Sequence, residues 1–164
     1  MAEPALPPGV AIHDLRAADA PPGALEAASH AVWQYWLDVT SRPWPEQRAA
    51  WLEAPSGDTL PIRLGAIADG KCVGTVSLVA CDLAQRPDLA PWVASVLVWP
   101  AWRGRGLGVA LMAAIEQAAA ACGYDAAYLF TPDAEAFYAR LRWSAFDYDL
   151  ARGQEVVIMR KAIG

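Results

Sequence analysis

Apolar residues recur along the chain with two different periods, and each period indicates a type of secondary structure. In the N-terminal part, four apolar residues lie at helical spacing, namely Leu25, Ala28, Val32 and Trp36. They predict an amphipathic helix over residues 24–38, and the apolar residues 10–15 before it are typical of a short strand. After a proline break, a second short helix is expected at residues 45–53.

The middle of the chain is dominated by β-rich runs. Residues 60–83 contain two of them, joined at Asp69-Gly70, which is the strongest short signal for a hairpin turn. A continuous apolar run, WVASVLVW at residues 92–99, then predicts a strand that is buried on both faces. This strand leads directly into a stretch rich in glycine and arginine.

The segment after that stretch predicts a helix followed by a parallel strand. One apolar face indicates the helix, formed by Leu107, Leu111, Ile115 and Ala118. Gly123 is a natural C-terminal cap, and a strand is expected at residues 126–130. Because both connections are short, the two strands and the helix should form a right-handed unit in which the strands are parallel.

The last elements are a helix and a hairpin. Thr131 is expected to cap a helix whose first residue is Pro132. This helix carries Phe137, Tyr138 and Leu141. Residues 143–161 close the chain as a hairpin with its turn near residues 152–154. No repeat, linker or low-complexity segment interrupts the sequence, so residues 1–164 are expected to form one mixed α/β domain.

The composition and the net charge exclude some classes of protein. Of the 164 residues, 55% are hydrophobic and 19% are charged, which is far from a disordered composition. The formal net charge of -5 argues against nucleic-acid binding, because affinity for a polyanion comes from clustered Lys and Arg. Residues 1–9 lack the features of a signal peptide, and no apolar run reaches membrane-spanning length, so no membrane association is expected.

The three cysteines suggest a cellular compartment. Cys72, Cys81 and Cys122 are odd in number and lack the spacing of metal ligands. We therefore expect reduced, structural thiols in a cytoplasmic protein, and neither a disulfide framework nor a bound metal.

The stretch WRGRGLGVAL, at residues 102–111, carries the candidate chemistry. A helix N-terminus binds anions through its unpaired N–H groups and its partial positive charge, and glycines allow a ligand to approach the backbone closely. Arg103 and Arg105 add charge, which indicates a phosphate-binding loop. A Walker loop would need a Gly-Lys-Ser/Thr ending, and a dinucleotide fingerprint would need glycine in place of Val109. The alternative is a solvated turn that merely starts a helix.

The longer stretch VWPAWRGRGLGVALM resembles the signature of the GNAT acetyltransferase superfamily, Arg/Gln-x-x-Gly-x-Gly/Ala, which Arg103, Gly106 and Gly108 satisfy. RPDLAPWVASVLVWP resembles the family's central strand, and YLFTPDAEAFYARLRW resembles its next strand and tyrosine-bearing helix. The resemblance covers residues 69–143 well and the two N-terminal helices more loosely. It implies a single-domain fold with a mixed, mostly antiparallel sheet, in which a central splayed pair of parallel strands is flanked by helices.

The resemblance also implies acetyl-coenzyme A as co-substrate. Its pyrophosphate is expected on the backbone amides of Gly104, Arg105, Gly106, Leu107, Gly108 and Val109. Its pantetheine arm is expected to pair with the backbone of Val96, Leu97 and Val98, as an additional strand would. The apolar side chains of these three residues are compatible with a backbone role.

The family transfers acetyl groups directly to an amine, and the resemblance implies that Tyr138 protonates the departing thiolate. A phenol of ordinary pKa is a plausible acid for a thiolate. The alternative for Tyr138 is an aromatic ring packed on the core with its hydroxyl at the rim. A backbone N–H of the central strand, that of Val98, is expected to polarise the carbonyl group. The general base is left unassigned between water and four side chains: His13, Asp82, Asp88 and Glu135.

Two residues depart from the family pattern. Thr131 stands where relatives commonly have an asparagine that touches the cofactor, and it is still expected to contact the cofactor. Arg142 stands where relatives often have glycine. Because a left-handed turn would strain a non-glycine residue, the link into the following strand is expected to be shaped differently.

The acceptor is the least defined part of the site. Four aromatic residues cluster in the region that walls the acceptor site in relatives: Trp33, Tyr35, Trp36 and Trp44. They could hold a cationic or apolar amine, or fill the core beneath two short helices. The acceptor is expected to be a small-molecule amine or a peptide N-terminus, and the sequence leaves a homodimer open. Two other classes are a non-catalytic acyl-coenzyme A sensor and, least favoured by the acidic charge, a nucleic-acid module.

Overall fold

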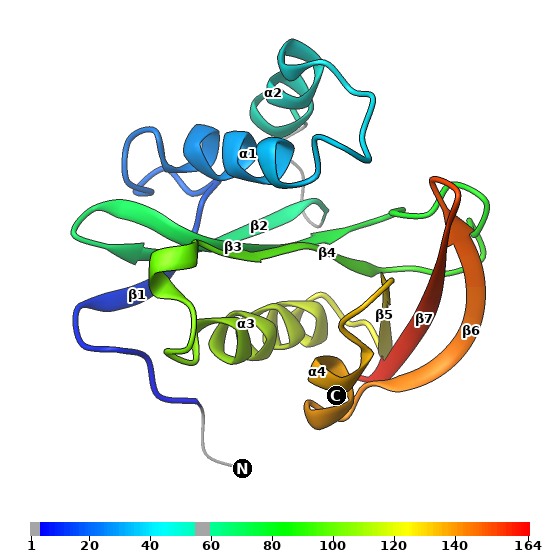
Figure 1. Ribbon diagram of the computed structural model, residues 1–164. Coiled ribbons are helices and arrows are strands. Elements are labelled where there is room, and N and C mark those ends of the chain that lie inside the picture. Colours follow the sequence, from blue (N-terminus) through cyan, green and yellow to red (C-terminus); the bar gives the residue numbers. More distant parts are fainter. Residues whose placement is uncertain (1–3, 55–59) are drawn as a thin grey trace.

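The computed structural model describes residues 4–54 and 60–164 of the chain, so residues 1–3 of the N-terminal segment discussed above lie outside it. One seven-stranded sheet has helices on both faces (Figure 1). Helices α1 and α2 cover one face, and α3 and α4 lie on the other. The expected mixed α/β architecture is confirmed.

The strand order across the sheet is β1-β2-β3-β4-β5-β7-β6. The strands are β1 (Val10–Asp14), β2 (Ile62–Ala68), β3 (Lys71–Val79), β4 (Trp92–Val98), β5 (Ala126–Thr131), β6 (Ser144–Ala151) and β7 (Gln154–Ala162). All neighbours are antiparallel except β4 and β5, which are parallel as the sequence predicts.

The parallel pair is splayed. β4 and β5 are in register only where Trp92 faces Tyr128. On the other side of β4, Thr75 faces Leu97 but Ser77 faces Ala94, so β4 contains one extra residue at this point. Ser95 lies within this bulge and has a left-handed φ of 55°. A bulge bends a strand and increases its twist, which directs the end of β4 away from β5.

Of the four α-helices in the described part of the chain, three have bounds that differ from expectation. The helices are α1 (Ala24–Tyr35), α2 (Trp44–Leu52), α3 (Leu107–Ala121) and α4 (Glu135–Arg140). α1 ends three residues earlier than predicted, where the residues become mostly exposed. α2 begins and ends one residue earlier than predicted.

The start predicted for α4 at Pro132 is wrong. The hydroxyl oxygen of Thr131 accepts hydrogen bonds from the amides of Asp133, at 3.4 Å, and Ala134, at 3.0 Å. These bonds hold a turn that delays the helix to Glu135, and α4 has no side-chain cap of its own.

The link after α4 also differs from expectation. Arg142 itself adopts the left-handed conformation, with a φ of 70°, so the turn keeps the shape that glycine would give it. The amide of Trp143 donates to the carbonyl of Tyr138 and that of Arg142 to the carbonyl of Ala139, which forms a Schellman motif. α3 ends in the same motif at Gly123, as the sequence predicts.

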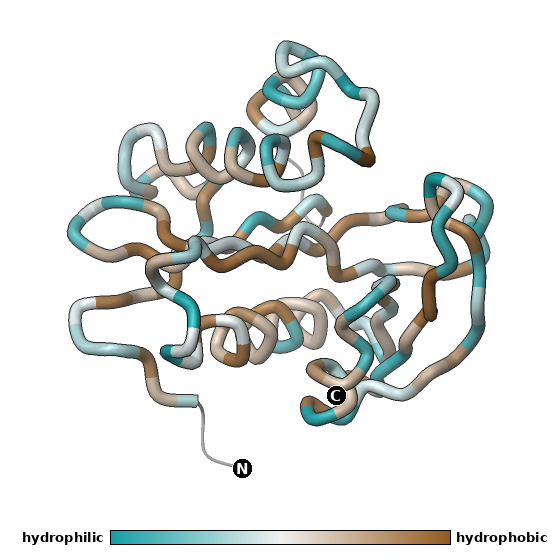
Figure 2. The backbone as a smooth tube through the Cα atoms, in the orientation of Figure 1, coloured by the Kyte–Doolittle hydropathy of each residue, from teal (hydrophilic) through white to brown (hydrophobic). Residues whose placement is uncertain are grey.

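Apolar side chains pack on both faces of the sheet. The backbone in Figure 2, coloured by hydropathy, shows apolar residues along the strands and on helices of both faces. Leu111 and Ile115 of α3 are fully buried against one face. Ala28 of α1 and Trp51 of α2 are buried against the other. β4 is thus covered on both sides, which confirms the prediction from its continuous apolar run.

Candidate active site

An open groove of about 1,090 Å³ runs across the region where β4 separates from β5. Its walls come from α1, α2, β2, the bulged part of β4, the end of β5, α4 and the turn between β6 and β7. Ser95, Val96, Thr131 and Tyr138 all line it. The splay therefore brings the central strand, the next strand and the predicted catalytic tyrosine to one site.

The glycine loop lies just beyond the end of β4. Gly104 and Gly106 have left-handed φ angles of 75° and 81°, and a Cβ on either would meet no atom within 4 Å. Gly106 is the N-cap of α3 and has no side-chain cap, so the first N–H groups of the helix are not used by a capping side chain. The loop thus combines an open approach with free helix N–H groups, which suits an anion.

Both arginines of the loop are held in place by their neighbours. The Nε atom of Arg103 donates a hydrogen bond to the carbonyl oxygen of Val98 at 3.0 Å. The guanidinium of Arg105 lies over the ring of Trp102, 4.7 Å from its centroid. Both side chains remain exposed, so their charge stays available beside the loop.

Gly108 connects the loop to α4 and to β4. A Cβ at this position would lie 3.4 Å from Cζ of Phe137 and 4.0 Å from Cγ2 of Val98. The first turn of α3, the end of β4 and the helix that bears Tyr138 therefore meet at one point.

Backbone groups on β4 face the splay. The amide of Trp99 donates to the carbonyl of Val73 on β3. Because successive residues of a strand alternate in direction, the amide of Val98 points to the opposite edge, toward β5, and so does that of Val96. The amide of Leu97 points to β3. The involvement of all three residues in cofactor binding stays a prediction.

Tyr138 is buried on α4, with 9% of its surface exposed. Burial and, to a lesser degree, the charge of Asp133 raise its pKa to about 12, so the phenol is neutral at physiological pH. Within the described residues its hydroxyl makes no hydrogen bond, although the side chain lines the groove. It is thus a protonated donor without a protein acceptor, and its catalytic role stays a prediction.

Of the four side chains considered as general base, only Asp82 lines this groove. Water reaches this residue, yet the surrounding protein displaces enough solvent to raise the pKa of its carboxyl to about 6, against the opposing charges of Arg152 and Arg63. Asp88 instead forms an ion pair with Arg86 at 3.1 Å. His13 lies on β1, and Glu135 begins α4 without lining the groove.

Three of the four members of the aromatic cluster line the groove, and their role in holding an acceptor stays a prediction. Trp33, Tyr35 and Trp36 line it, and Tyr35 is 58% exposed. Trp44 does not line the groove, and its ring packs edge-on against His30 with centroids 4.8 Å apart.

Sequence reasoning missed Arg63, which also lines the groove and is 8% exposed. A signal was present, because Arg63 is the only charged residue within the apolar run that becomes β2. Its importance depends on its neighbours from α2 and β3, and these are known only from the fold.

Two further observations concern the described part of the chain. No helix there has the length and apolar character needed to cross a membrane. No group of three or more His, Cys, Asp or Glu side chains in residues 4–54 and 60–164 could hold a metal ion.

The model of a family described as the acetyltransferase (GNAT) family matches residues 25–142. Among solved structures, an acyl-CoA N-acyltransferase from Pseudomonas aeruginosa is 25% identical, with a TM-score of 0.65 over 93% of this chain and 98% of its own. An aminoglycoside 6'-acetyltransferase of type Ii is 18% identical, with a TM-score of 0.72, and the match covers 93% of this chain and 96% of its own. An aminoglycoside 6'-N-acetyltransferase complexed with coenzyme A is 15% identical, with a TM-score of 0.70, and the match covers 93% of this chain and 96% of its own. These last two show a shared fold. No curated protein matches the chain in sequence.

Proposed function

The chain belongs to the GNAT acetyltransferase family, and we propose that residues 1–164 are one N-acetyltransferase domain that moves an acetyl group from acetyl-coenzyme A directly to a primary amine. The main support is the splay of β4 from β5, which opens a groove lined by Tyr138 next to backbone N–H groups of β4. This arrangement combines a proton donor with a donor for a carbonyl oxygen.

The residues around the glycine loop fit a pyrophosphate. We assign its contacts to the amides of residues 104–109, because Gly104 and Gly106 leave open space beside the N-terminus of α3. The pantetheine arm would lie along Val96 and Val98, whose amides face the splay, and Thr131 would contact it from the end of β5. Acetyl-coenzyme A supplies the acetyl group as an activated thioester.

Tyr138 and Val98 have different roles in the proposed acyl transfer. The phenol of Tyr138 holds its proton at neutral pH, as an unperturbed phenol also would, and it can donate that proton to the departing thiolate. Burial raises its pKa to about 12, which makes it a weaker acid, so its position in the groove rather than its acidity supports this role. The amide of Val98 is fixed by the strand, so it can stabilise negative charge on a carbonyl oxygen without rearrangement.

We assign the role of general base to Asp82. It lies in the same groove as Tyr138, at the start of the loop that joins β3 to β4, and the residue is exposed. A pKa of about 6 leaves the group ionised and able to accept a proton at neutral pH.

The acceptor is a small-molecule amine or a peptide N-terminus, which enters along the aromatic wall of Trp33, Tyr35 and Trp36. A homodimer stays a prediction. Its support is a row of exposed apolar residues on the edge strand β6, namely Phe146, Tyr148 and Leu150. A cytoplasmic location also stays a prediction, based on the three cysteines, none of which is in a disulfide.

One experiment tests the proposed function. Release of free coenzyme A is measured from acetyl-coenzyme A with a panel of primary amines, and binding is measured separately as a thermal shift. We expect a thermal shift together with amine-dependent thiol release. A shift without turnover for any amine would instead support the non-catalytic acyl-coenzyme A sensor.

A further inference from the structure

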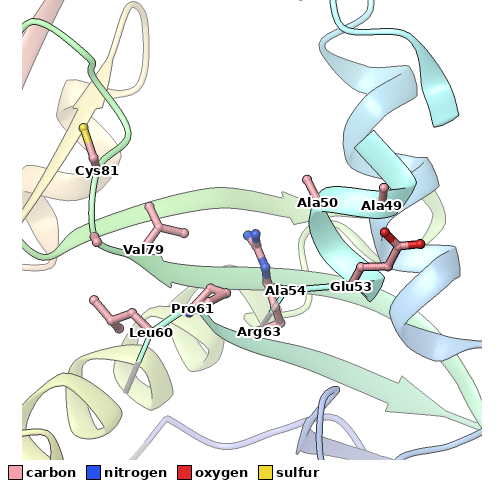
Figure 3. Close-up of a pocket in the computed structure, with 10 residues that line it drawn as sticks. Ala49, Ala50, Glu53, Ala54, Leu60, Pro61, Arg63, Val79 and Cys81 are labelled. Carbon is pink, nitrogen blue, oxygen red and sulfur yellow. The ribbon is translucent and has the colours of Figure 1, made fainter. Parts of the chain in front are cut away.

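Arg63 is a buried cation in the wall of the proposed acceptor groove. It lies on β2 and is 8% exposed, and Figure 3 shows its side chain projecting toward α2 with its nitrogen atoms in a pocket of about 580 Å³. The same side chain also lines the main groove that contains Tyr138. It can therefore be reached from the site where the acceptor is expected.

The polar contacts of this guanidinium are incomplete. Its Nη1 atom donates to Oγ of Ser77 at 2.8 Å, and the ring of Trp51 covers it at 4.0 Å. Its Nε atom is buried and has no hydrogen-bond partner among residues 4–54 and 60–164. None of the ion pairs among the described residues includes Arg63. The labelled carboxylate of Glu53 points away from it in Figure 3.

Two other arginines, Arg16 and Arg42, act electrostatically on Arg63 although the whole chain is acidic. Burial lowers the pKa of Arg63 to about 10, with contributions from Arg16 and Arg42, while Asp82 acts in the opposite direction. The group remains protonated at neutral pH. A buried charge without a partner is costly, and an anionic ligand would remove that cost.

The register of the sheet places Arg63 close to the reaction centre. Arg63 faces Ser77 on β3, and Ser77 faces Ala94 on β4, so the three residues form one row across adjacent strands. The backbones of Arg63 and Ala94 are therefore two strand spacings apart, which is about 10 Å. The bulge residue Ser95, which lines the groove, follows Ala94 directly.

We propose that Arg63 binds a carboxylate of the acceptor, so that the substrate is an amine that also carries a carboxylate, such as an amino acid or a short peptide. This inference rests on the proposed acetyl transfer and deepens it. A planar guanidinium is well suited to a carboxylate. A single buried cation with Asp82 nearby matches a monoanion better than a doubly charged phosphate.

The test compares matched acceptors with the wild-type protein. Unbranched amino acids with a terminal amine and a terminal carboxylate, in a series of increasing chain length, are compared with their carboxamides and with the corresponding alkylamines, by thiol release from acetyl-coenzyme A. At the best chain length we expect the carboxylate to have a kcat/KM about 10- to 100-fold above that of the carboxamide, because one charged hydrogen-bonding partner is lost. Equal values at every length, with turnover intact, would overturn the inference and leave the proposed function standing.

Variants and a binding measurement complete the test. Arg63→Gln should abolish the preference for carboxylates, Arg63→Lys should retain part of it, and the exposed Arg48→Gln should leave it unchanged. Calorimetry with coenzyme A checks that each variant is folded. If no amine is acetylated, the proposed function fails. The inference is then tested by thermal shifts of the wild-type protein with coenzyme A present. We expect alkanoates to stabilise the protein more than alkanols of the same length. Equal shifts would overturn the inference.

Discussion

The Nε atom of Arg103 donates a hydrogen bond across 3.0 Å to the carbonyl oxygen of Val98, which ties the glycine loop to the end of the central strand. The bond occupies the carbonyl on the edge of β4 that faces the splay and leaves the amide of Val98 free on the same edge. Arg103 thus has two roles in the proposed site, since it positions the loop and brings a cation next to it.

Replacing Arg103 by alanine should weaken coenzyme A binding without abolishing it. The backbone amides carry most of the phosphate contact, so we expect a loss of about 1–2 kcal/mol, or a 5- to 30-fold increase in Kd. Calorimetry with coenzyme A and with dephosphorylated pantetheine measures this loss. Arg105→Ala is the matched control and should have a smaller effect, because Arg105 stacks on Trp102. Equal wild-type affinities for the two ligands would remove the phosphate site.

Gly106→Val should abolish coenzyme A binding. Gly106 has a φ of 81°, where a β-branched residue is strained, and the new side chain would enter the open space in which the pyrophosphate is expected. Gly123→Val imposes similar strain at the other end of α3, with a φ of 87°, but lies away from the loop. Calorimetry on both variants, after a check of folding by circular dichroism, separates strain from loss of the site. Comparable losses in the two variants would contradict our assignment.

Local signals in the sequence were sufficient for the turns and the parallel pair. Asp69 and Gly70 have φ angles of 51° and 74°, and Arg152 and Gly153 have 52° and 78°, as two-residue hairpin turns require. The order of strand, helix and strand indicated that β4 and β5 are parallel, because short connections leave few alternatives.

Other parts of the site depend on contacts between distant segments. The left-handed Ser95 has no sequence signal, since it arises from the register between β3 and β4. Pro132 is typical of a helix start, but the hydroxyl of Thr131 binds the following amides and delays α4. Arg63 was visible as a lone charge in an apolar strand. That it has no ion-pair partner among the described residues could be recognised only after the fold placed Ser77 and Trp51 around it.

Asp82→Asn should remove the acid limb of the pH profile. If Asp82 is the base, wild-type kcat/KM should fall below about pH 6, where its carboxyl becomes protonated. The variant should lose roughly 100-fold in kcat/KM at pH 7.5 and show no limb near pH 6. Asp88→Asn, which removes a surface ion pair with Arg86, is the control. An unchanged acid limb in Asp82→Asn would exclude Asp82 as the base.

The same substitution should change how stability depends on pH. The pKa of Asp82 is raised from 3.8 to about 6 in the folded state, so the folded protein holds this proton more tightly than the unfolded chain. The contribution of Asp82 to stability is therefore present below about pH 4 and is lost as the pH rises through 6. Asp82→Asn should gain stability over the wild type between pH 4 and pH 7, as measured by urea denaturation. A constant difference across this range would show that the folded carboxyl has its ordinary pKa.

Tyr138→Phe separates catalysis from packing, because it deletes one oxygen and keeps the buried ring. The hydroxyl makes no hydrogen bond among the described residues, so no hydrogen bond is lost and the free energy of unfolding should change by less than about 1 kcal/mol. If the phenol protonates the thiolate, kcat should fall by roughly 10²- to 10⁴-fold while the Kd for acetyl-coenzyme A stays within a few-fold. Single-turnover rates at saturating cofactor measure the chemical step directly.

Tyr128→Phe on β5, whose ring packs near Trp92, is the matched control and should keep the wild-type rate. An equal loss of binding and rate would mean that the hydroxyl of Tyr138 holds the cofactor, whereas an unchanged chemical step would remove Tyr138 from the mechanism.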